Sequence, residues 1–136
     1  MPGVTFQSMS SGQTVYLVDD DVSVRVGLAR LMRTAGYEVL AFGSVRAFLD
    51  SLESEASGCI VLDSKMTEMT GEELLLELRE RDLNFPIIFV TADDTPELRQ
   101  TAEKMQAAGF FRKPVDGPAL LDAVKWALRP RTKLEK

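Results

Sequence analysis

The sequence predicts a single α/β domain in which a parallel, doubly wound β-sheet carries helices on both faces. Three observations predict this class. Short apolar runs occur five times along the chain, each run is followed by a segment with apolar residues at every third or fourth position, and most runs are continuously apolar. Continuous apolar strands separated by helices are typical of parallel sheets that are covered on both sides. The 136 residues of the chain suffice for one domain with its own core.

The first two strand–helix pairs form the N-terminal part of this domain. Thr14–Val18 (TVYLV) has the pattern of a buried strand, and Tyr37–Phe42 (YEVLAF) alternates as a second strand. Gly36 suits the end of the first helix, and Ser44 suits the N-cap of the second. The apolar residues of the two helices are Val24, Leu28, Leu31, Met32 and Ala35 in the first, and Val45, Phe48, Leu49 and Leu52 in the second.

The third pair lies in the middle of the chain. Gly58–Leu62 (GCIVL) has a buried-strand pattern that ends at Asp63. Thr70, with Glu73 three residues later, has the spacing of a capping box, in which two side chains satisfy free amide groups at the start of a helix. We therefore expect a helix to begin after Thr70.

Proline residues mark the last two pairs. Pro86–Val90 (PIIFV) has a fourth strand pattern, and Thr95 followed by a proline predicts a helix that runs to about residue 107. Phe110–Arg112 is expected to be a short fifth strand. Pro118 opens the last helix, and Pro130 marks its end.

The residues outside this pattern are expected to be tails. Residues 1–13 are rich in Ser and Gly and show no periodicity. Residues 129–136 are charged and contain a proline, which suits a tail or the start of a linker. The predicted domain therefore covers residues 14–128.

The composition excludes several classes of function. The chain has no histidine, so it can form no Ser–His–Asp triad and no histidine metal site, and its single cysteine, Cys59, allows no internal disulfide. The net charge of −5 argues against direct binding of nucleic acid. No apolar run approaches the length of a membrane span, and no signal-peptide pattern is present. We therefore expect a cytoplasmic protein that contacts neither nucleic acid nor membrane directly.

Polar side chains follow the predicted strands. Asp19–Asp21 comes after the first strand, Asp63 after the third, Thr91 after the fourth, and Lys113 after the fifth. In an open parallel sheet, binding sites form at the carboxyl ends of the strands, where the strand order reverses. We therefore expect these carboxylates, the hydroxyl and the amine to meet at one edge.

This set of groups suits phosphoryl chemistry with a metal ion. Clustered carboxylates repel one another and need a compensating cation, and Mg²⁺ prefers such hard oxygen ligands. An aspartate beside the metal can act as a nucleophile and form an aspartyl-phosphate. A lysine can neutralise charge on the transferring group, and a threonine hydroxyl can donate a hydrogen bond to it.

Four motifs in this order resemble the receiver domain of two-component response regulators. They are VDDD at Val18–Asp21 with Arg25 after it, GCIVLDSKM around Asp63, FVTA at Phe89–Ala92, and FFRKP at Phe110–Pro114. The similarity covers roughly residues 14–128, and the opening YLVDDDVSVR with the segment GYEVLAF most resembles the FixJ-like subgroup. The resemblance implies a CheY-like fold with the strand order 2-1-3-4-5.

The resemblance also implies the roles of the acidic residues. Asp19 and Asp20 would be the acidic pair that binds Mg²⁺, and Asp63 would be both a metal ligand and the phosphate acceptor. Lys65 would supply a backbone carbonyl to the metal. The domain would not be an enzyme on other substrates, since it catalyses only its own Mg²⁺-dependent phosphorylation and dephosphorylation.

Switching is implied by three further positions. Thr91 would be the switch hydroxyl, Lys113 would pair with the phosphoryl group, and Phe110 takes the place of the aromatic residue that changes rotamer. The Lys113–Pro114 peptide bond is expected to be cis. The implied partners are a sensor histidine kinase, a second copy bound through the fourth helix, fifth strand and fifth helix, and a DNA-binding output domain outside this chain that would regulate transcription.

The sequence departs from the family pattern at three places. The usual Met-Pro is Met66-Thr67 here, which should loosen the loop beside the acceptor, and the usual Asp-Gly is Thr70-Gly71, which keeps a good helix cap. Lys65 adds a cation close to the acceptor, and we expect it to alter the lifetime of the phosphoryl group.

Simpler interpretations remain for some residues. Asp21 suits a helix N-cap better than a metal ligand, and Phe110 suits plain core packing as well as a switch. Cys59 is expected to be a small core residue and Trp126 to pack on the last helix or at a contact surface.

Three other functions fit parts of the sequence. A Mg²⁺-dependent phosphohydrolase could use the same carboxylates, but Lys65 occupies the position where such enzymes place a second aspartate. A receiver fold that no longer switches would be a constitutive interaction module. A nucleotide-binding fold would need a glycine-rich phosphate loop, and an acidic triplet follows the first strand instead.

Overall fold

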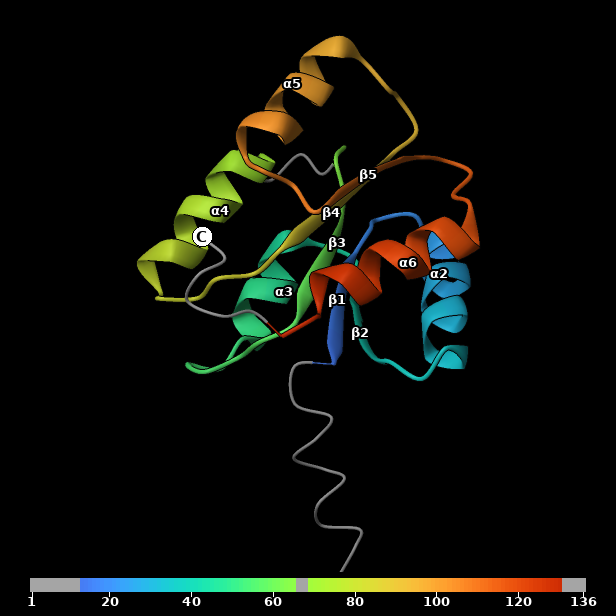
Figure 1. Cartoon of the computed structure of the whole chain (residues 1–136). Coiled ribbons are helices and arrows are strands. Elements are labelled where there is room, and N and C mark those ends of the chain that lie inside the picture. The colour runs from blue at the N-terminus through green and yellow to red at the C-terminus, as the bar shows by residue number, and fades with distance from the viewer. Residues whose placement is uncertain (1–12, 66–68, 131–136) are drawn as a thin grey trace, which may run out of the picture.

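The computed structural model describes residues 13–65 and 69–130. Its strands and helices alternate along the chain (Figure 1). The strands are β1 (Thr14–Val18), β2 (Glu38–Phe42), β3 (Cys59–Asp63), β4 (Ile87–Thr91) and β5 (Gly109–Arg112). The helices are α2 (Val22–Thr34), α3 (Val45–Ser51), α4 (Gly71–Glu80), α5 (Pro96–Lys104) and α6 (Gly117–Ala127).

The strands form one parallel sheet in the order β2-β1-β3-β4-β5. This order and the parallel pairing confirm the fold class predicted from the sequence. The order reverses between β1 and β3, and the carboxyl ends of these two strands lie side by side, with Val18 opposite Leu62. The central strands β1, β3 and β4 are buried along their whole length, because helices cover both faces of the sheet.

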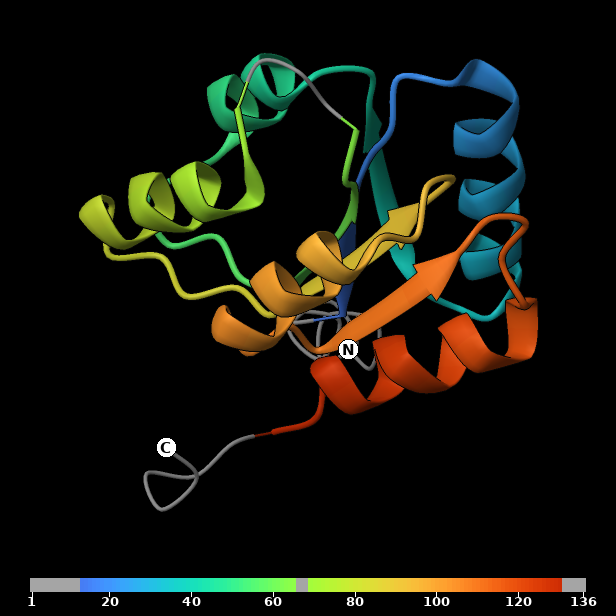
Figure 2. The same ribbon diagram turned by 90° about the horizontal axis from the view of Figure 1, so that it is seen from above.

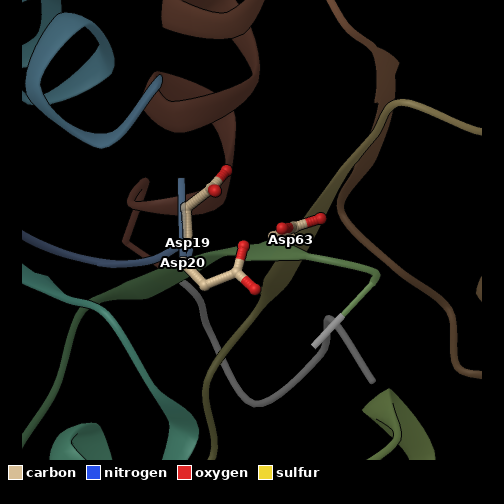
Figure 3. Close-up of side chains that lie close together, drawn as sticks. All are labelled: Asp19, Asp20 and Asp63. Carbon is tan, nitrogen blue, oxygen red and sulfur yellow. The ribbon is translucent and has the colours of Figure 1, made fainter. Parts of the chain in front are cut away.

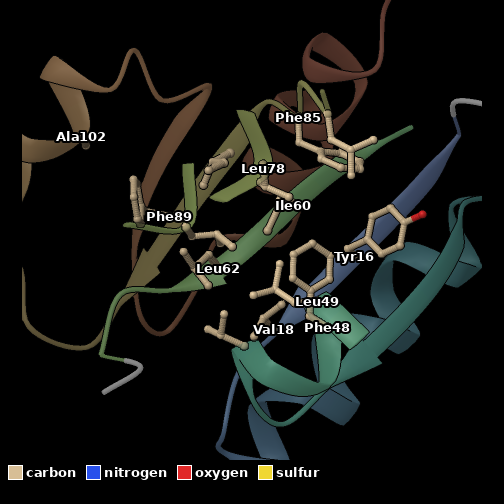
Figure 4. Close-up of a cluster of buried hydrophobic side chains, with 14 residues drawn as sticks. Tyr16, Val18, Phe48, Leu49, Ile60, Leu62, Leu78, Phe85, Phe89 and Ala102 are labelled. Atoms are coloured by element: carbon tan, nitrogen blue, oxygen red, sulfur yellow. The ribbon is translucent and has the colours of Figure 1, made fainter. Parts of the chain in front are cut away.

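Helices α3, α4 and α5 cover one face of the sheet, and α2 and α6 cover the other (Figure 2). Alternate residues of each strand therefore enter different cores. In β1, Tyr16 and Val18 pack with Phe48 on the α3–α4–α5 side, shown in Figure 4, whereas Val15 and Leu17 pack with Met32 on the α2–α6 side.

The helix starts follow the capping signals of the sequence. The Ser44 hydroxyl accepts a hydrogen bond from the Ala47 amide (3.0 Å). The capping box predicted at Thr70 is complete, because the Thr70 hydroxyl accepts from the Glu73 amide (3.0 Å) and the Glu73 carboxylate accepts from the Thr70 amide (2.9 Å). Asp21 caps α2 by accepting from the Val24 amide (3.1 Å), which confirms its interpretation as an N-cap.

Several strand boundaries differ from the prediction by one residue, and β2, β4 and β5 begin at Glu38, Ile87 and Gly109. Asp63 and Thr91 are the last residues of β3 and β4, because their backbones continue the ladder that the apolar pattern alone ends one residue earlier. Gly58 lies outside β3 with a φ of 141°, and a Cβ there would collide with the Thr14 carbonyl oxygen. The Lys113–Pro114 bond is cis, as expected. Among the described helices, none is long and apolar enough to cross a membrane.

Candidate functional site

The carboxyl edge of the sheet gathers the predicted polar residues. Asp19 follows β1 directly, Asp63 ends β3, and Thr91 ends β4; all three side chains are buried. Lys113 follows the edge strand β5, and its ammonium reaches the carboxylates of Asp19 and Asp63. The edge therefore brings together residues from four strands that are distant in the sequence.

Three carboxylates form the centre of the site (Figure 3). Asp19, Asp20 and Asp63 each present a carboxylate oxygen, and these oxygens lie within 4.8 Å of one another. Asp19 and Asp63 are buried, whereas Asp20 is exposed at the mouth. The structure thus brings together the three aspartates that the sequence assigned to the metal.

Lys113 is the cation that faces this cluster. Its Nζ lies 2.9 Å from Asp19 Oδ2 and 3.6 Å from Asp63 Oδ2. Burial by itself lowers the pKa of Lys113, but the contact with Asp19 and the charges of Asp19 and Asp63 outweigh it and raise the pKa above its ordinary value. The ammonium therefore stays charged and is held beside Asp63.

The pKa of the Asp63 carboxyl is raised above its ordinary value. Burial raises its pKa most, and the charges of Asp19 and Asp20 raise it further, against the opposing effects of the Lys65 amide hydrogen bond and of Lys113. Burial and the two neighbouring carboxylates therefore outweigh the opposing effects of Lys113 and the Lys65 amide.

The donor set fits Mg²⁺. Asp19 Oδ2 is buried and accepts no hydrogen bond of good geometry from any described residue, although it lies in ion-pair contact with Lys113. A buried carboxylate oxygen with this free capacity, beside two more carboxylates, is the kind of hard ligand that Mg²⁺ takes while it keeps waters for a phosphate.

Lys65 lies beside Asp63, but its ammonium turns outward. Its amide donates a 3.1 Å hydrogen bond to Asp63 Oδ1, which restrains the orientation of this carboxylate. Its Nζ lies 3.9 Å from Asp93 Oδ2, with more than half of each side chain exposed. The extra cation is therefore shared with Asp93 across the mouth of the site. Met66 and Thr67, which we expected to loosen this loop, lie outside the described residues.

The Thr91 hydroxyl is engaged in its own loop. It accepts a hydrogen bond from the Asp93 amide (3.0 Å) and donates one to the Asp93 carbonyl (3.2 Å). Its side chain is fully buried. The hydroxyl has a single proton to donate, so it would have to give up the Asp93 carbonyl before it could donate to another acceptor.

Phe110 is half-buried on β5 and packs against α5. The Arg99 guanidinium lies over its ring, 4.9 Å from the centroid, and forms two 2.7 Å hydrogen bonds with the Asp94 carboxylate. A cavity of about 350 Å³ opens beside this ring, between α5 and β5. Asp94 lies in the loop after β4, three residues after Thr91. Arg99 therefore contacts both this loop, through Asp94, and the ring of Phe110.

Sequence reasoning missed these connecting residues. Asp93, Asp94 and Arg99 stand in no recognised motif, and the five-residue spacing of Asp94 and Arg99 is not one that predicts a pair on a helix. Arg25 was noticed as part of a motif but without a role. Its guanidinium donates a 2.7 Å hydrogen bond to the Asp19 carbonyl.

Comparisons with known proteins agree on one family. The model of the response regulator receiver domain matches residues 15–125. The chain is 39% identical over 118 residues to the transcriptional regulatory protein TdiR of Thauera aromatica, covering 87% of this chain and 52% of TdiR. It is 37% identical over 115 residues to nodulation protein W of Bradyrhizobium diazoefficiens, covering 85% of this chain and 51% of that protein.

Solved structures show the same fold. The response regulator StyR superposes with a TM-score of 0.76 at 43% identity, covering 85% of this chain and 58% of StyR. FixJ-N superposes with a TM-score of 0.77 at 31% identity, covering 88% of this chain and 95% of FixJ-N. The chain spans about half the length of the curated relatives that it matches. With a family model over most of its length and the acidic edge in place, the chain belongs to the response regulator receiver domains and has FixJ-like relatives.

Proposed function

We propose that this receiver domain is a phosphorylation-dependent switch that takes a phosphoryl group from a sensor histidine kinase onto Asp63. The observation that carries the proposal is the contact of the partly buried Lys113 ammonium with the buried carboxylates of Asp19 and Asp63 at the carboxyl edge of the sheet. This edge holds a nucleophilic carboxylate, an uncompensated negative charge suited to Mg²⁺ and a cation in one place.

The transfer balances as a displacement at phosphorus. A carboxylate oxygen of Asp63 attacks the phosphorus of a phosphohistidine, the new O–P bond forms as the N–P bond breaks, and the imidazole, protonated on its other ring nitrogen, leaves as the neutral ring. Lys113 stabilises charge on the phosphoryl oxygens. Hydrolysis reverses the modification, because water attacks the phosphorus and releases Asp63 and phosphate.

The metal would be held by oxygen atoms of this chain. The carboxylates of Asp19, Asp20 and Asp63 and the backbone carbonyl of Lys65 would bind it. When bound, Mg²⁺ supplies positive charge that neutralises the acidic cluster and the phosphoryl group. Lys65 and Asp93, paired at the mouth, stand where water would enter, so they would influence how long the phosphoryl group lasts.

The switch would run from Thr91 to Phe110. A phosphoryl group on Asp63 offers the Thr91 hydroxyl a charged acceptor in place of the Asp93 backbone. A shift of this loop would move Asp94, and with it the Arg99 guanidinium that lies on Phe110. The surface of α5, β5 and α6 would then rearrange and control either a homodimer or an output domain.

The partners follow from the relatives. A receiver domain implies a histidine kinase, and several relatives with about twice this length are named transcriptional regulators. We therefore propose a cytoplasmic regulator whose DNA-binding output domain lies outside this chain. The receiver itself would contact neither DNA nor membrane.

Intact mass measurement tests the proposal. Incubation with Mg²⁺ and acetyl phosphate is expected to add one phosphoryl mass, about 80 Da, to the parent chain and nothing to Asp63→Asn. Omission of Mg²⁺ should abolish the gain. A folded parent that gains no mass from either acetyl phosphate or a phosphorylated histidine kinase would contradict the switch and favour a constitutive interaction module.

A further inference from the structure

We propose that Arg25 is a positioning residue for the metal site, because its guanidinium fixes the main chain of Asp19 and so the carboxylate that faces the metal. The inference rests on the proposed function only in taking the acidic cluster as a Mg²⁺ site. It assigns a task to a residue on α2 that does not itself offer a metal ligand.

Asp19 is held through both its main chain and its carboxylate. Its amide donates to the Phe42 carbonyl (3.1 Å), its Oδ1 accepts from the Asp21 amide (2.9 Å), and its Oδ2 faces Lys113 at 2.9 Å. Its carbonyl accepts one hydrogen bond from the described residues, the 2.7 Å bond from Arg25 Nη1. Because Asp19 is completely buried, loss of Arg25 would leave this carbonyl without a partner.

Gly43 leaves space for the guanidinium of Arg25. Arg25 is half-buried and reaches from the first turn of α2 across the ends of β1 and β2. Gly43 follows β2, and a Cβ at this position would lie 3.3 Å from Arg25 Nη1 and 3.7 Å from its Cζ. The backbone of Gly43 is outside the left-handed region, so its conformation does not itself require a glycine. The feature that the structure shows at this position is the space left for the Arg25 guanidinium.

Charge and geometry make opposite predictions for Arg25. A guanidinium beside a metal site repels Mg²⁺, so removal of the charge alone would strengthen metal binding. Removal of the bond that orients Asp19 would weaken it, since loss of a residue that orients a metal ligand typically costs about tenfold or more in affinity. The sign of the change therefore separates the two roles.

Calorimetric titration of the whole chain with MgCl₂ tests the proposal. Arg25→Ala is expected to weaken Mg²⁺ binding about tenfold. Arg25→Lys keeps the charge but lacks the planar, multi-donor group, so it should recover only part of the loss. Arg30→Ala removes the same charge from an exposed position of the same helix and should leave the affinity unchanged.

Gly43→Ala gives an independent arm that keeps Arg25 in place. The added methyl group should press on the guanidinium and weaken Mg²⁺ binding in the parent, but have no effect in Arg25→Ala. This dependence is not expected if Gly43 matters only for the β2–α3 turn. The arm also keeps the test informative if Arg25→Ala folds poorly, which circular dichroism would show.

Phosphoryl uptake from acetyl phosphate gives the last readout. Arg25→Ala should need more Mg²⁺ for half-maximal rate but reach the parent rate at saturation. An Arg25→Ala variant that binds Mg²⁺ as tightly as the parent, or more tightly, would overturn the inference. A parent that binds Mg²⁺ but takes up no phosphoryl group from either acetyl phosphate or a phosphorylated histidine kinase would refute the proposed function and leave the role of Arg25 to be decided by the titration.

Discussion

The Asp63 carboxylate illustrates, at the scale of one residue, how a functional group is kept at a cost to stability. Its pKa is raised by burial and by its two acidic neighbours, so the folded state disfavours its charged form. We expect Asp63→Asn to raise the free energy of unfolding at pH 7 without Mg²⁺ by about 1 kcal/mol, which corresponds to about 4 °C in Tm. Asparagine keeps the Oδ1 that accepts from the Lys65 amide.

The pH dependence of this effect has a definite sign. Because the folded-state pKa of Asp63 is raised, the cost is absent at acid pH, where the carboxyl is protonated in both states, and it develops as the pH rises through that pKa. Thermal melts of the parent and Asp63→Asn should therefore diverge upward from about pH 4. Asp122→Asn on the exposed face of α6 is the control. Equal melts at pH 7 would show that the cluster carries no such cost.

Residue types at the site were predictable, but their orientations were not. The topology alone brings Asp19, Asp63, Thr91 and Lys113 to one edge, because each follows or ends a parallel strand. No sequence pattern predicted that the Thr91 hydroxyl forms hydrogen bonds with the Asp93 backbone. Such choices depend on competing local hydrogen bonds whose donors and acceptors occur in every loop.

At the scale of the element, the start of α4 shows that a residue that departs from the family pattern can still cap the helix. Thr70 replaces the usual aspartate and forms the complete capping box with Glu73. We expect Thr70→Ala to cost about 1 kcal/mol in urea unfolding, because one helix amide loses its partner. Thr70→Asp should be as stable as the parent, since aspartate caps equally well. A cost shared by both variants would refute capping as the reason.

Element boundaries show where local patterns stop being sufficient. Gly58 read as the start of a strand from its apolar neighbours, yet its backbone has a φ of 141° and it packs against the Thr14 carbonyl of the neighbouring strand. That constraint comes from β1, more than forty residues away in the sequence. The strands and helices that the structure describes were predicted, because most strands carry a continuous apolar run and most helices carry a cap or a proline signal.

At the scale of the whole molecule, the sequence predicted the layers of the fold but not the contacts that connect the acidic edge with the outer face. Alternating apolar strands and helices require a covered parallel sheet, and the order β2-β1-β3-β4-β5 followed from the family resemblance. The connection from the acidic edge to the outer face runs through Asp94 and Arg99 to Phe110, and it depends on three-dimensional contacts alone. This connection makes the α5–β5 face the place to look for a response to phosphorylation.

The final prediction concerns that face. If the phosphoryl group on Asp63 rearranges α5, β5 and α6, acetyl phosphate with Mg²⁺ should shift the chain from monomer to dimer in sedimentation velocity. Glu103→Arg places a second cation beside Arg99 at the rim of the α5–β5 cavity, so it should keep the phosphorylated chain monomeric while phosphoryl uptake stays at the parent rate. Arg30→Glu changes the net charge by two units in the opposite sense on α2, across the sheet, and should dimerise like the parent. A phosphorylated parent that stays monomeric would leave the acceptor chemistry intact and exclude this face as a homodimer surface, whereas equal loss of dimer in both variants would show that the effect is not specific to the α5–β5 face.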